Sequence, residues 1–439
     1  MDVCLSPLDS RYYNKIKYVA RLFCNENFTI IKIHIEVEYL KFLLKYLLKN
    51  NLQININIIN SIFEKVEKEP SVEIKKINDI EKQTNHDVQA IVQYLKQEVP
   101  CELIPFVHFG LTSQDINSPA MVITYKTYVR EILIKDLDIL EFNLNDIINK
   151  TSKNVMLSFT HGQPATPTTF GKQMNIFLQK ILKIKHEIST QYVFATKMGG
   201  SNGSLSALKS VYPEYNWDDL IELFLRNRFE LERNKYTSQI DDYTNYYKLF
   251  QIFQRICVVL INLCQDMWLY CSKKYLKLRK INNEVGSSAM PHKINPIHFE
   301  NAEGNLKLCI DMFESIGRNI CINRLQRDLT DSTMLRNVGV ACGHLTLAIR
   351  NISLGLERIE LNTDEIEKDL NENSIVVMEF IQLKMRHNGF ENAYDLCKEY
   401  SRGKSKFNFN EFIEFLSSKN ININEEIMNS LDINLESYY

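Results

Sequence analysis

The sequence lacks an excess of either charge, a long apolar run and a secretory signal. Its 439 residues include 52 Lys and Arg against 54 Asp and Glu, a formal net charge of -2. This balance gives no support for binding to nucleic acid or to a membrane surface. The longest apolar run, Ile256–Ile261, is far shorter than the roughly 20 residues of a membrane span. The N-terminus also lacks the basic patch and apolar stretch of a signal peptide.

Cysteine usage indicates neither disulfides nor a metal centre. The chain has ten cysteines, but none stands in a C-x-x-C pair, so metal and redox motifs of that type are absent. A chain of this length without a secretory signal is expected in the cytoplasm, where thiols stay reduced. Cys257, Cys264 and Cys271 recur every seven residues, and we interpret them as small hydrophobic residues on one helix face. No cofactor and no metal are expected.

Apolar residues recur at intervals of three and four in several segments. This spacing predicts long helices that pack side by side at shallow angles. No convincing run of alternating residues predicts strands, so the predicted fold class is all-α. The repeats are Ile33, Val37, Leu40, Leu44 and Leu47; Leu133, Leu137, Leu140, Leu144 and Ile147; Phe177, Ile181, Ile184 and Ile188; Leu249, Phe253, Ile256, Leu260, Leu263 and Met267; and Val338, Cys342, Leu345, Ile349, Ile352, Leu356 and Ile359.

The repeats and the helix breakers divide the chain into three predicted domains. Residues 102–356 form a central bundle, since they hold the longest helical patterns. Residues 1–101 form an N-terminal domain of shorter helices, and residues 357–439 form a C-terminal domain that includes a small helix around Phe412 and Leu416. Several central helices carry an apolar stripe on more than one side. Such helices must be covered on both faces, which predicts an oligomer that pools its central helices.

A polar loop, Gly286–Asn295, interrupts this helical pattern. It reads Gly-Ser-Ser-Ala-Met-Pro-His-Lys-Ile-Asn. Gly286 permits backbone angles that are closed to other residues, and Pro291 disfavours a helical conformation at Met290. By composition alone this is an ordinary Gly/Ser/Pro loop.

Further polar clusters interrupt the apolar periodicity. Taken singly, each has a structural explanation: Thr112 and Ser113 as helix N-caps, the histidines as hydrogen-bonded structural residues, the arginines on a solvated face, and the cluster Gly199–Gly203 as a turn rather than a phosphate loop. The clusters are Thr84–Asp87; Leu111–Asp115, after His108-Phe109-Gly110; Thr160–Ala165, before a helix expected to contain Pro167 in its N-terminal region; and Arg327–Ser332, leading to Arg336.

In order and spacing, these clusters resemble the adenylosuccinate lyase family. The loop is similar to the signature S-S-x-M-P-x-K-x-N of the wider fumarase, aspartase and argininosuccinate lyase superfamily. The bacterial-type form is the most similar, because Thr-Asn-His-Asp, Thr-His-Gly-Gln-Pro-Ala-Thr-Pro and Arg-Asp-Leu-Thr-Asp-Ser-Thr all stand intact. Some positions depart from the family pattern: Ser10 stands where Gly often precedes Arg-Tyr, Gln114 replaces a common acidic residue, and the tail after about 420 is short.

The resemblance implies a fold, an assembly and a reaction. Family members have three helical domains, form homotetramers through their central bundles, and build each active site from three subunits. They cleave fumarate from a small-molecule substrate, adenylosuccinate, to leave AMP, and many also cleave SAICAR to AICAR. Both reactions belong to purine nucleotide biosynthesis.

The resemblance also implies roles for individual residues. His161 matches the general acid, Ser287 the general base, and Glu300 a carboxylate that orients the catalytic histidine. Lys293 and His86 are expected to take part in both catalysis and binding. The positions expected to bind substrate are Arg11, Tyr12, Asn85, His86, Asp87, Thr112, Ser113, Gln239, Ser288, Lys293, Asn295, Asn301, Arg327, Ser332, Thr333 and Arg336.

These residue types suit the chemistry. The elimination removes a proton next to a carboxylate and builds negative charge, which Lys293 and Asn295 can stabilise. A serine becomes basic only in a closed, dry site, and a mobile Gly-Ser-Ser lid would provide one. A histidine that titrates near neutrality can protonate the departing nitrogen. Two alternatives remain: a superfamily lyase acting on argininosuccinate, malate or aspartate, and a non-catalytic helical scaffold.

Overall fold

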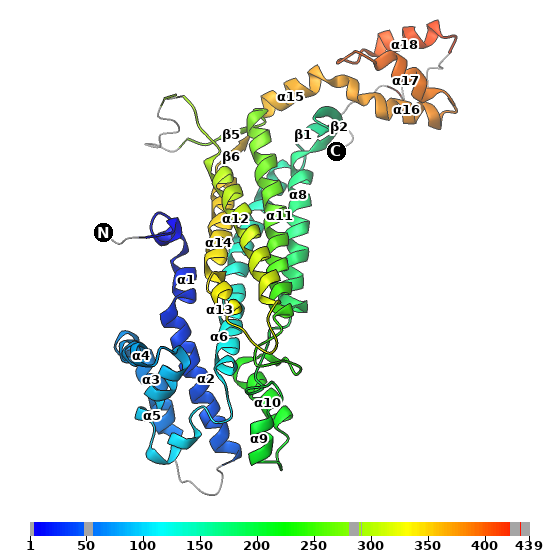
Figure 1. Cartoon of the computed structure of the whole chain (residues 1–439). Coiled ribbons are helices and arrows are strands. Elements are labelled where there is room, and N and C mark those ends of the chain that lie inside the picture. The colour runs from blue at the N-terminus through cyan, green and yellow to red at the C-terminus, as the bar shows by residue number, and fades with distance from the viewer. Residues whose placement is uncertain (1–3, 48–55, 281–288, 291, 422–430, 432–439) are drawn as a thin grey trace. The chain divides into compact units, whose positions relative to one another are not determined.

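The computed structural model describes residues 4–47, 56–280, 289–290, 292–421 and 431. The predicted all-α class is confirmed (Figure 1). The α-helices are α1 (Tyr13–Phe23), α2 (Asn25–Tyr46), α3 (Ile56–Lys68), α4 (Pro70–Thr84), α5 (Asp87–Glu98), α6 (Ser113–Tyr128), α7 (Ile134–Thr151), α8 (Phe170–His186), α9 (Ser206–Val211), α10 (Trp217–Phe229), α11 (Thr244–Ser272), α12 (Ile297–Ile320), α13 (Thr330–Leu335), α14 (Val338–Leu356), α15 (Thr363–Glu372), α16 (Met378–His387), α17 (Ala393–Ser401) and α18 (Phe409–Ser418).

The apolar residues that repeat along the sequence lie on the buried faces of helices. In α2, α7, α11 and α14 the apolar residues that step by three and four are buried. Side chains three and four residues apart lie on one face of an α-helix, which is why the spacing predicted these elements correctly. Cys257 and Cys264 are buried on α11, as predicted for small core residues, whereas Cys271 is only half-buried. Ile359, the last member of one repeat, instead lies in a short strand after α14.

The described residues also form three small two-stranded sheets that the sequence did not predict. The strands are β1 (Val155–Thr160) with β2 (Gln163–Thr169), β3 (Ala195–Thr196) with β4 (Glu232–Arg233), and β5 (Leu276–Leu278) with β6 (Ile359–Leu361).

The sequence interpretation was wrong about the segment after Thr160–Ala165. Pro167 was expected near the start of a helix, but it lies in β2, and α8 begins at Phe170. Proline disfavours the helical conformation of the residue before it. Pro164 and Pro167 therefore favour an extended backbone in this segment. The segment pairs with β1 on one side only, and proline is tolerated in such an edge strand.

Short 3₁₀ and π turns complete the described elements. Two π turns extend helices without a break in the chain: η3 (Val129–Leu133) between α6 and α7, and η4 (Glu187–Gln191) after α8. The 3₁₀ turns are η1 (Pro7–Asp9), η2 (Cys101–Phe106) and η5 (Ser374–Val377).

The chain divides into two compact units. Unit 1 comprises Met1–Asp138, Lys183–Ile261 and Ala302–Arg350, and unit 2 comprises Ile139–Leu182, Asn262–Asn301 and Asn351–Tyr439. The three domains predicted from the sequence, 1–101, 102–356 and 357–439, remain a prediction.

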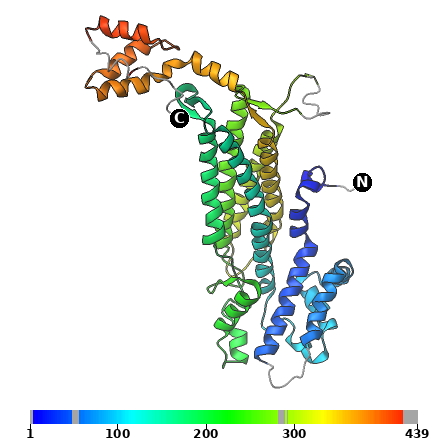
Figure 2. The same cartoon turned by 180° about the vertical axis from the view of Figure 1, so that it is seen from behind.

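Unit 1 has an aromatic core between helices α6, α11 and α12. Tyr125 and Tyr128 of α6 meet Phe250 and Phe253 of α11, and both phenylalanine rings lie within 5.3 Å of the ring of Phe313 on α12. Offset and edge-to-face pairs of this kind add to the burial of apolar area. The shorter helices α3, α4 and α5 lie beside α2, as both views in Figures 1 and 2 show.

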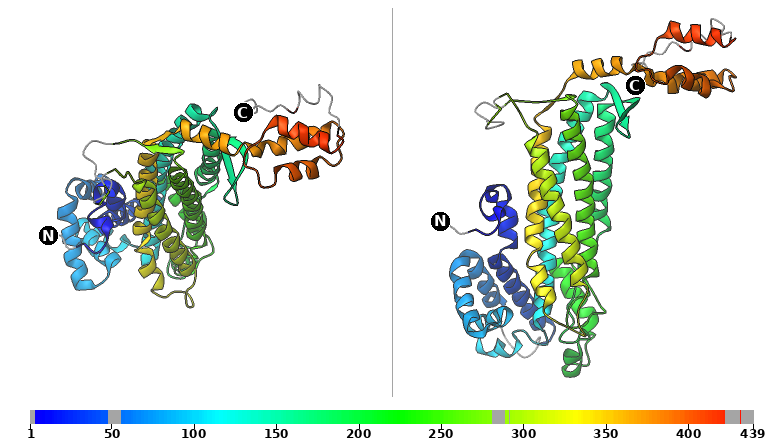
Figure 3. Two further views of the ribbon diagram at one scale, coloured as in Figure 1. Left: turned by 90° about the horizontal axis from the view of Figure 1, so that it is seen from above. Right: turned by 45° about the horizontal axis from the view of Figure 1, so that its top comes forward.

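Unit 2 contains the β1–β2 hairpin and a separate cluster of C-terminal helices. Phe159 of β1 contacts Tyr275, whose ring stacks on Tyr270 of α11. The ammonium of Lys273 lies 3.6 Å from the centre of the Phe159 ring. Helices α16, α17 and α18 lie side by side (orange to red in Figure 3) and enclose their own core, which includes Phe412 and Leu416.

Helix α11 is the one described helix that is long and apolar enough to cross a membrane, judged by length and composition alone. Half of its most apolar window is buried inside the structure. A core helix passes the same test, and the buried face of α11 includes Leu249, Phe253, Ile256, Leu260 and Leu263.

Candidate active site

His161 occupies the tip of the β1–β2 hairpin. Thr160 pairs with Gln163, so His161 and Gly162 form a two-residue loop. Both have positive φ, 54° and 74°, which a type I′ hairpin turn requires of its two central residues. Glycine adopts such angles freely, and histidine tolerates them better than most residues. The turn therefore presents the imidazole of His161 on an exposed hairpin tip.

The predicted lid leads into helix α12. Ser287 and Ser288 lie outside the described residues. Lys293 is exposed, and its backbone N–H donates to the carbonyl of Met290 at 3.1 Å. Asn295 follows two residues later, before α12 begins at Ile297.

Glu300 lies in the first turn of α12, and its partner is not a histidine. Its Oε1 accepts a hydrogen bond from the indole N–H of Trp268 at 3.0 Å. Among the described residues of one chain, no hydrogen bond or ion pair joins Glu300 to His161, so its role in orienting the catalytic histidine stays a prediction. The next residue, Asn301, accepts a hydrogen bond from the buried Asn351 at 2.5 Å.

The motif Thr84–Asp87 joins two helices. Asn85 ends α4 in the left-handed conformation, with φ 51°, which asparagine tolerates better than most residues. His86 is the N-cap of α5, and its Nδ1 accepts the N–H of Gln89 at 3.3 Å. Asp87 pairs with Lys32 at 2.6 Å. Burial alone would raise the pKa of Asp87, but the charge and hydrogen bond of Lys32 outweigh it and lower that pKa.

Of the two residues predicted as N-caps, Thr112 is confirmed as the N-cap of helix α6, whereas Ser113 is the first residue of the helix and not its cap. Thr112 is the N-cap, and its backbone N–H donates to Oδ2 of Asp115 at 2.8 Å, as in one half of a capping box. The hydroxyl of Ser113 lies 3.4 Å from Nε2 of His86. Two clusters that are 27 positions apart in the sequence therefore meet in unit 1.

Asp115 also explains the glycine cluster at 199–203. The amides of Gly199 and Gly200 donate to its carboxylate at 2.8 and 3.1 Å. These amides therefore bind the carboxylate of a residue of the protein itself. The prediction that the glycine cluster is a structural turn, and not a phosphate-binding loop, is confirmed. Gly203 has φ +81°, and a Cβ on it would lie 1.9 Å from the carbonyl oxygen of Thr237. Glycine is therefore required where this turn meets the segment before Gln239.

Gln239 and Arg327 lie on segments that a hydrogen bond ties together. The hydroxyl of Ser238 donates to the carbonyl of Gln326 at 2.9 Å. Both flanking predicted residues, Gln239 and Arg327, are half-buried.

Helix α13 carries Ser332 and Thr333, with Arg336 as its C-cap. The backbone N–H of Ser332 donates to Oδ1 of Asp331 at 2.7 Å, and the other carboxylate oxygen of Asp331 accepts the hydroxyl of Tyr243 at 2.6 Å. The start of α13 is thus anchored to the segment that follows Gln239.

Arg11 and Tyr12 precede helix α1. The guanidinium of Arg11 is exposed and lies 5.9 Å from the centre of the Tyr12 ring. Among the described residues, Arg11 makes no hydrogen bond or ion pair with the other predicted substrate-binding positions of unit 1.

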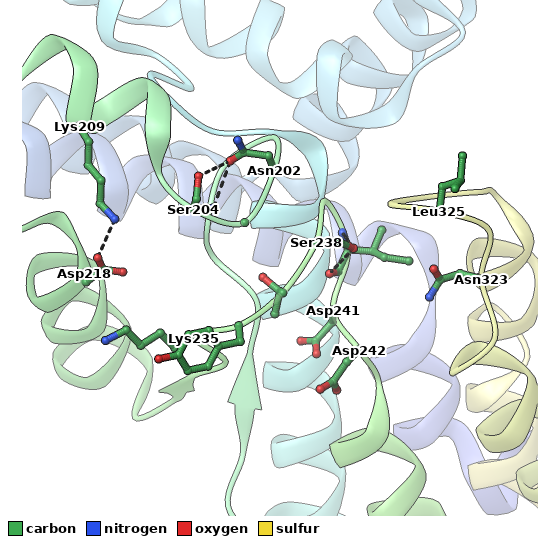
Figure 4. A pocket seen from close by; sticks show the side chains of 14 residues that line it. Asn202, Ser204, Lys209, Asp218, Lys235, Ser238, Asp241, Asp242, Asn323 and Leu325 are labelled. Atoms are coloured by element: carbon green, nitrogen blue, oxygen red, sulfur yellow. Dashed lines mark hydrogen bonds and ion pairs between the residues drawn. The ribbon is translucent and has the colours of Figure 1, made fainter.

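A cavity of about 590 Å³ lies in unit 1 between these segments (Figure 4). The segments on both sides of Gln239 line it, together with the glycine turn and the loop before Arg327. Carboxylates, amides, hydroxyls and two ammonium groups face it, which suits a polar ligand. The lining residues are Asn202, Gly203, Ser204, Lys209, Asp218, Lys235, Tyr236, Thr237, Ser238, Ile240, Asp241, Asp242, Asn323 and Leu325.

Sequence reasoning missed several buried polar residues next to these positions. Lys197, Asp241 and Tyr243 are each no more than 1 % exposed, and no motif marks them. Burial and repulsion by Asp242 raise the pKa of Asp241 to about 6. Burial lowers the pKa of Lys197, which the charge of Asp115 opposes. Within the described part of the chain, no group of three or more His, Cys, Asp or Glu side chains could hold a metal ion.

The fold is that of a known class of helical lyases. A family model described as "Lyase" matches residues 22–309. A fumarate lyase structure from Mesorhizobium sp. BNC1 aligns with a TM-score of 0.74 over 96 % of this chain and 94 % of that chain, at 16 % identity. A 3-carboxy-cis,cis-muconate lactonizing enzyme from Pseudomonas putida aligns with a TM-score of 0.76 over 96 % and 93 %, also at 16 % identity. At this identity, the likeness shows a shared fold.

Sequence comparison is more specific. A model described as "Adenylosuccinate lyase C-terminal" matches residues 323–439. The adenylosuccinate lyase of Dictyostelium discoideum is 36 % identical over 433 residues, which cover 95 % of this chain and 92 % of that protein. That of Legionella pneumophila (strain Corby) is 35 % identical over 421 residues, covering 94 % and 92 %. The chain belongs to the adenylosuccinate lyase family.

Proposed function

We propose that this protein is an adenylosuccinate lyase, a carbon–nitrogen lyase that eliminates fumarate from adenylosuccinate and leaves AMP. The observation that carries the proposal is similarity to adenylosuccinate lyases along nearly the whole chain, combined with the intact Thr160–Ala165 and Gly286–Asn295 motifs. The same elimination from SAICAR would give AICAR, and both reactions would serve purine nucleotide biosynthesis.

In the proposed reaction, Ser287 removes the proton next to a carboxylate of the succinyl group. The carbanion that forms carries additional negative charge, which Lys293 and Asn295 stabilise through a fixed positive charge and a hydrogen-bond donor. Ser288 and Asn301 contribute further contacts to the succinyl carboxylates. His161 protonates the purine nitrogen as the C–N bond breaks, and fumarate and AMP leave.

The nucleotide is bound by the residues of unit 1. His86 and Ser113, which lie within 3.4 Å of each other, offer neighbouring polar groups. Arginines bind phosphate and carboxylate through paired hydrogen bonds. The proposed binding positions in unit 1 are Arg11, Tyr12, Asn85, His86, Asp87, Thr112, Ser113, Gln239, Arg327, Ser332, Thr333 and Arg336.

The proposed assembly is a cytoplasmic homotetramer whose sites each draw on three subunits. Two features support it. Helices α11 and α12 expose large apolar side chains, among them Val258, Trp268, Leu269 and Leu308, and a partner would cover them. His161, Lys293 and Glu300 are exposed in the single chain, whereas the proposed chemistry needs a site from which water is excluded.

An ultraviolet assay of the purified protein with adenylosuccinate tests the function. Wild-type protein should release AMP and fumarate, and a parallel assay with SAICAR tests the second reaction. A panel with argininosuccinate, malate and aspartate serves as the specificity control. Turnover of one of these, with none of adenylosuccinate, would overturn the proposal.

Two variants test the assigned roles. Ser287→Ala should bind adenylosuccinate but lose turnover by orders of magnitude, because the hydroxyl proposed to take the proton is removed. His161→Gln should lose about 10²–10⁴-fold in kcat, the usual contribution of a positioned acid. His387→Gln, which changes an exposed histidine of α16, is the matched control and should keep wild-type turnover.

A further inference from the structure

The substrate-binding positions proposed for unit 1 lie on segments joined by buried polar side chains. We call the set Asp115, Ser118, Lys197, Asp241, Tyr243 and Asp331 the polar core network. Each member is no more than 2 % exposed. None of them belongs to the proposed binding positions themselves, and the mechanism above does not use them.

The network begins beneath the Thr112–Ser113 turn. Asp115 accepts the N–H of Thr112 at 2.8 Å and the ammonium of Lys197 at 2.6 Å. Lys197 donates a second hydrogen bond to the carbonyl of Gly200 at 2.7 Å. The ion pair therefore holds the start of α6 against the glycine turn that lines the cavity.

Ser118 links Lys197 to Asp241, near Gln239. It lies one turn further along α6, and its hydroxyl accepts the backbone N–H of Lys197 and donates to Asp241, both at 3.3 Å. Asn234 also donates to Asp241 at 2.9 Å. The residues two positions before and after Asp241 are Gln239 and Tyr243, so Asp241 fixes the backbone that carries the predicted glutamine.

Tyr243 completes the network at helix α13. Its backbone N–H points to Oδ1 of Asp241 at 3.4 Å, and its hydroxyl donates to Asp331 at 2.6 Å. Asp331 in turn accepts the N–H of Ser332 at 2.7 Å. Consecutive hydrogen bonds therefore connect Thr112 to Ser332 across 220 positions of the sequence.

Stability is a poor reason for such an arrangement. Removing charged groups from water costs several kcal/mol for each ion, and apolar side chains of similar volume often serve as well or better. Polar groups, unlike apolar contacts, have directional partners, and they hold the segments that carry them in one register.

We propose that the polar core network consists of positioning residues for the elimination. It holds the Thr112–Ser113, Gln239 and Ser332–Arg336 segments in the one relative arrangement that binds the nucleotide part of the substrate. This inference rests on the proposed function, because it takes adenylosuccinate as the ligand. The network touches no reacting atom. Its loss therefore weakens substrate binding more than it slows the chemical step.

The test compares two tyrosines of unit 1 that each lose one buried hydroxyl. Tyr243→Phe removes the donor to Asp331. Tyr128→Phe removes an equally buried hydroxyl that contacts the carbonyl of Cys342 at 3.2 Å and Thr346 at 3.1 Å, outside the network. Both variants should lose a similar amount of thermal stability, because each breaks buried hydrogen bonds.

Activity should separate the two variants. Tyr243→Phe should raise KM for adenylosuccinate and the inhibition constant of AMP by about tenfold, with kcat changed less, since one misplaced binding group costs about one hydrogen bond. Tyr128→Phe should keep wild-type values. Asp331→Asn should resemble Tyr243→Phe, and the double variant should be no worse than the single variants, because both break the same contact.

Each other outcome has a defined meaning. If Tyr243→Phe matches Tyr128→Phe in KM, kcat and AMP inhibition, the hydroxyl is structural and the inference is overturned. If Tyr243→Phe does not fold, Asp331→Asn against Tyr128→Phe decides in the same way. If wild-type protein does not turn over adenylosuccinate, the proposed function fails and this inference fails with it, a result that is visible before any variant is made.

Discussion

The two units present their predicted functional residues in opposite ways. In unit 1, the segments that carry the predicted nucleotide-binding residues are anchored by side chains that are almost fully buried, such as Asp115 and Tyr243. In unit 2, His161 stands on an exposed hairpin tip and Lys293 on an exposed loop. Within one chain, buried side chains therefore anchor the segments that carry the proposed binding residues. The groups proposed for acid–base chemistry still face solvent and must be covered before their environment can suit the reaction.

Subunit mixing should give the largest change in activity. It tests whether the serine and the histidine of one active site come from different chains. The Ser287→Ala and His161→Ala proteins should each be inactive alone. After exchange of subunits in equal amounts, activity should return to roughly a quarter of the wild-type value, because random assembly pairs an intact serine chain with an intact histidine chain in that share of sites. Absence of recovery, after mass spectrometry has verified exchange, would show that one chain supplies both residues.

Charge removal should be far more costly in unit 1 than in unit 2. Lys197→Met leaves the carboxylate of Asp115 buried without its ammonium partner, and we expect a loss of about 3–5 kcal/mol in the free energy of unfolding. The matched variant Lys150→Met removes an exposed pair with Asp146 on α7, which is worth about 0.3–0.5 kcal/mol. Urea unfolding of both proteins measures the difference, and equal losses would contradict the contrast drawn between the units.

The pH dependence of stability should report on Asp241. Its pKa is raised from 3.8 to about 6 in the folded chain, so the folded state holds this proton more tightly than the unfolded state. The contribution of Asp241 is therefore fully present below about pH 4 and is lost as the pH rises through about 6. Relative to Asp241→Asn, the wild-type protein should lose roughly 2 kcal/mol between pH 4 and pH 7. A difference that stays constant over this range would show that the group does not titrate there.

The smallest effect is expected beside the tip of the β1–β2 hairpin in unit 2, at Phe159. Lys273→Met removes the ammonium over the ring of Phe159, and a cation–π contact of this kind is worth about 0.5–1 kcal/mol. Thermal unfolding should detect a small shift, while kcat should stay near the wild-type value because the His161 turn is formed by the backbone. A large loss of kcat would mean that this contact helps to place the hairpin.

Local chemistry made much of the structure predictable. The spacing of Leu249, Phe253 and Ile256 is a property of neighbouring residues, and it predicted a helix with one buried face. Thr112 was predicted as a cap by its type and position alone. The β1–β2 hairpin was not predicted, since its residues do not alternate between apolar and polar, and Pro167 was placed in a helix when it lies in a strand.

The amino-acid sequence by itself determined the long helices, the capping residues and the motifs that identify the family, because each depends on residues that are close together in the chain. The tertiary structure alone decided which polar residues support those motifs. Asp115 meets Lys197, and Tyr243 meets Asp331, although more than 80 positions separate the members of each pair. Such contacts form when folding removes both partners from water, and no local pattern of residue types encodes which distant partner a buried charge will find.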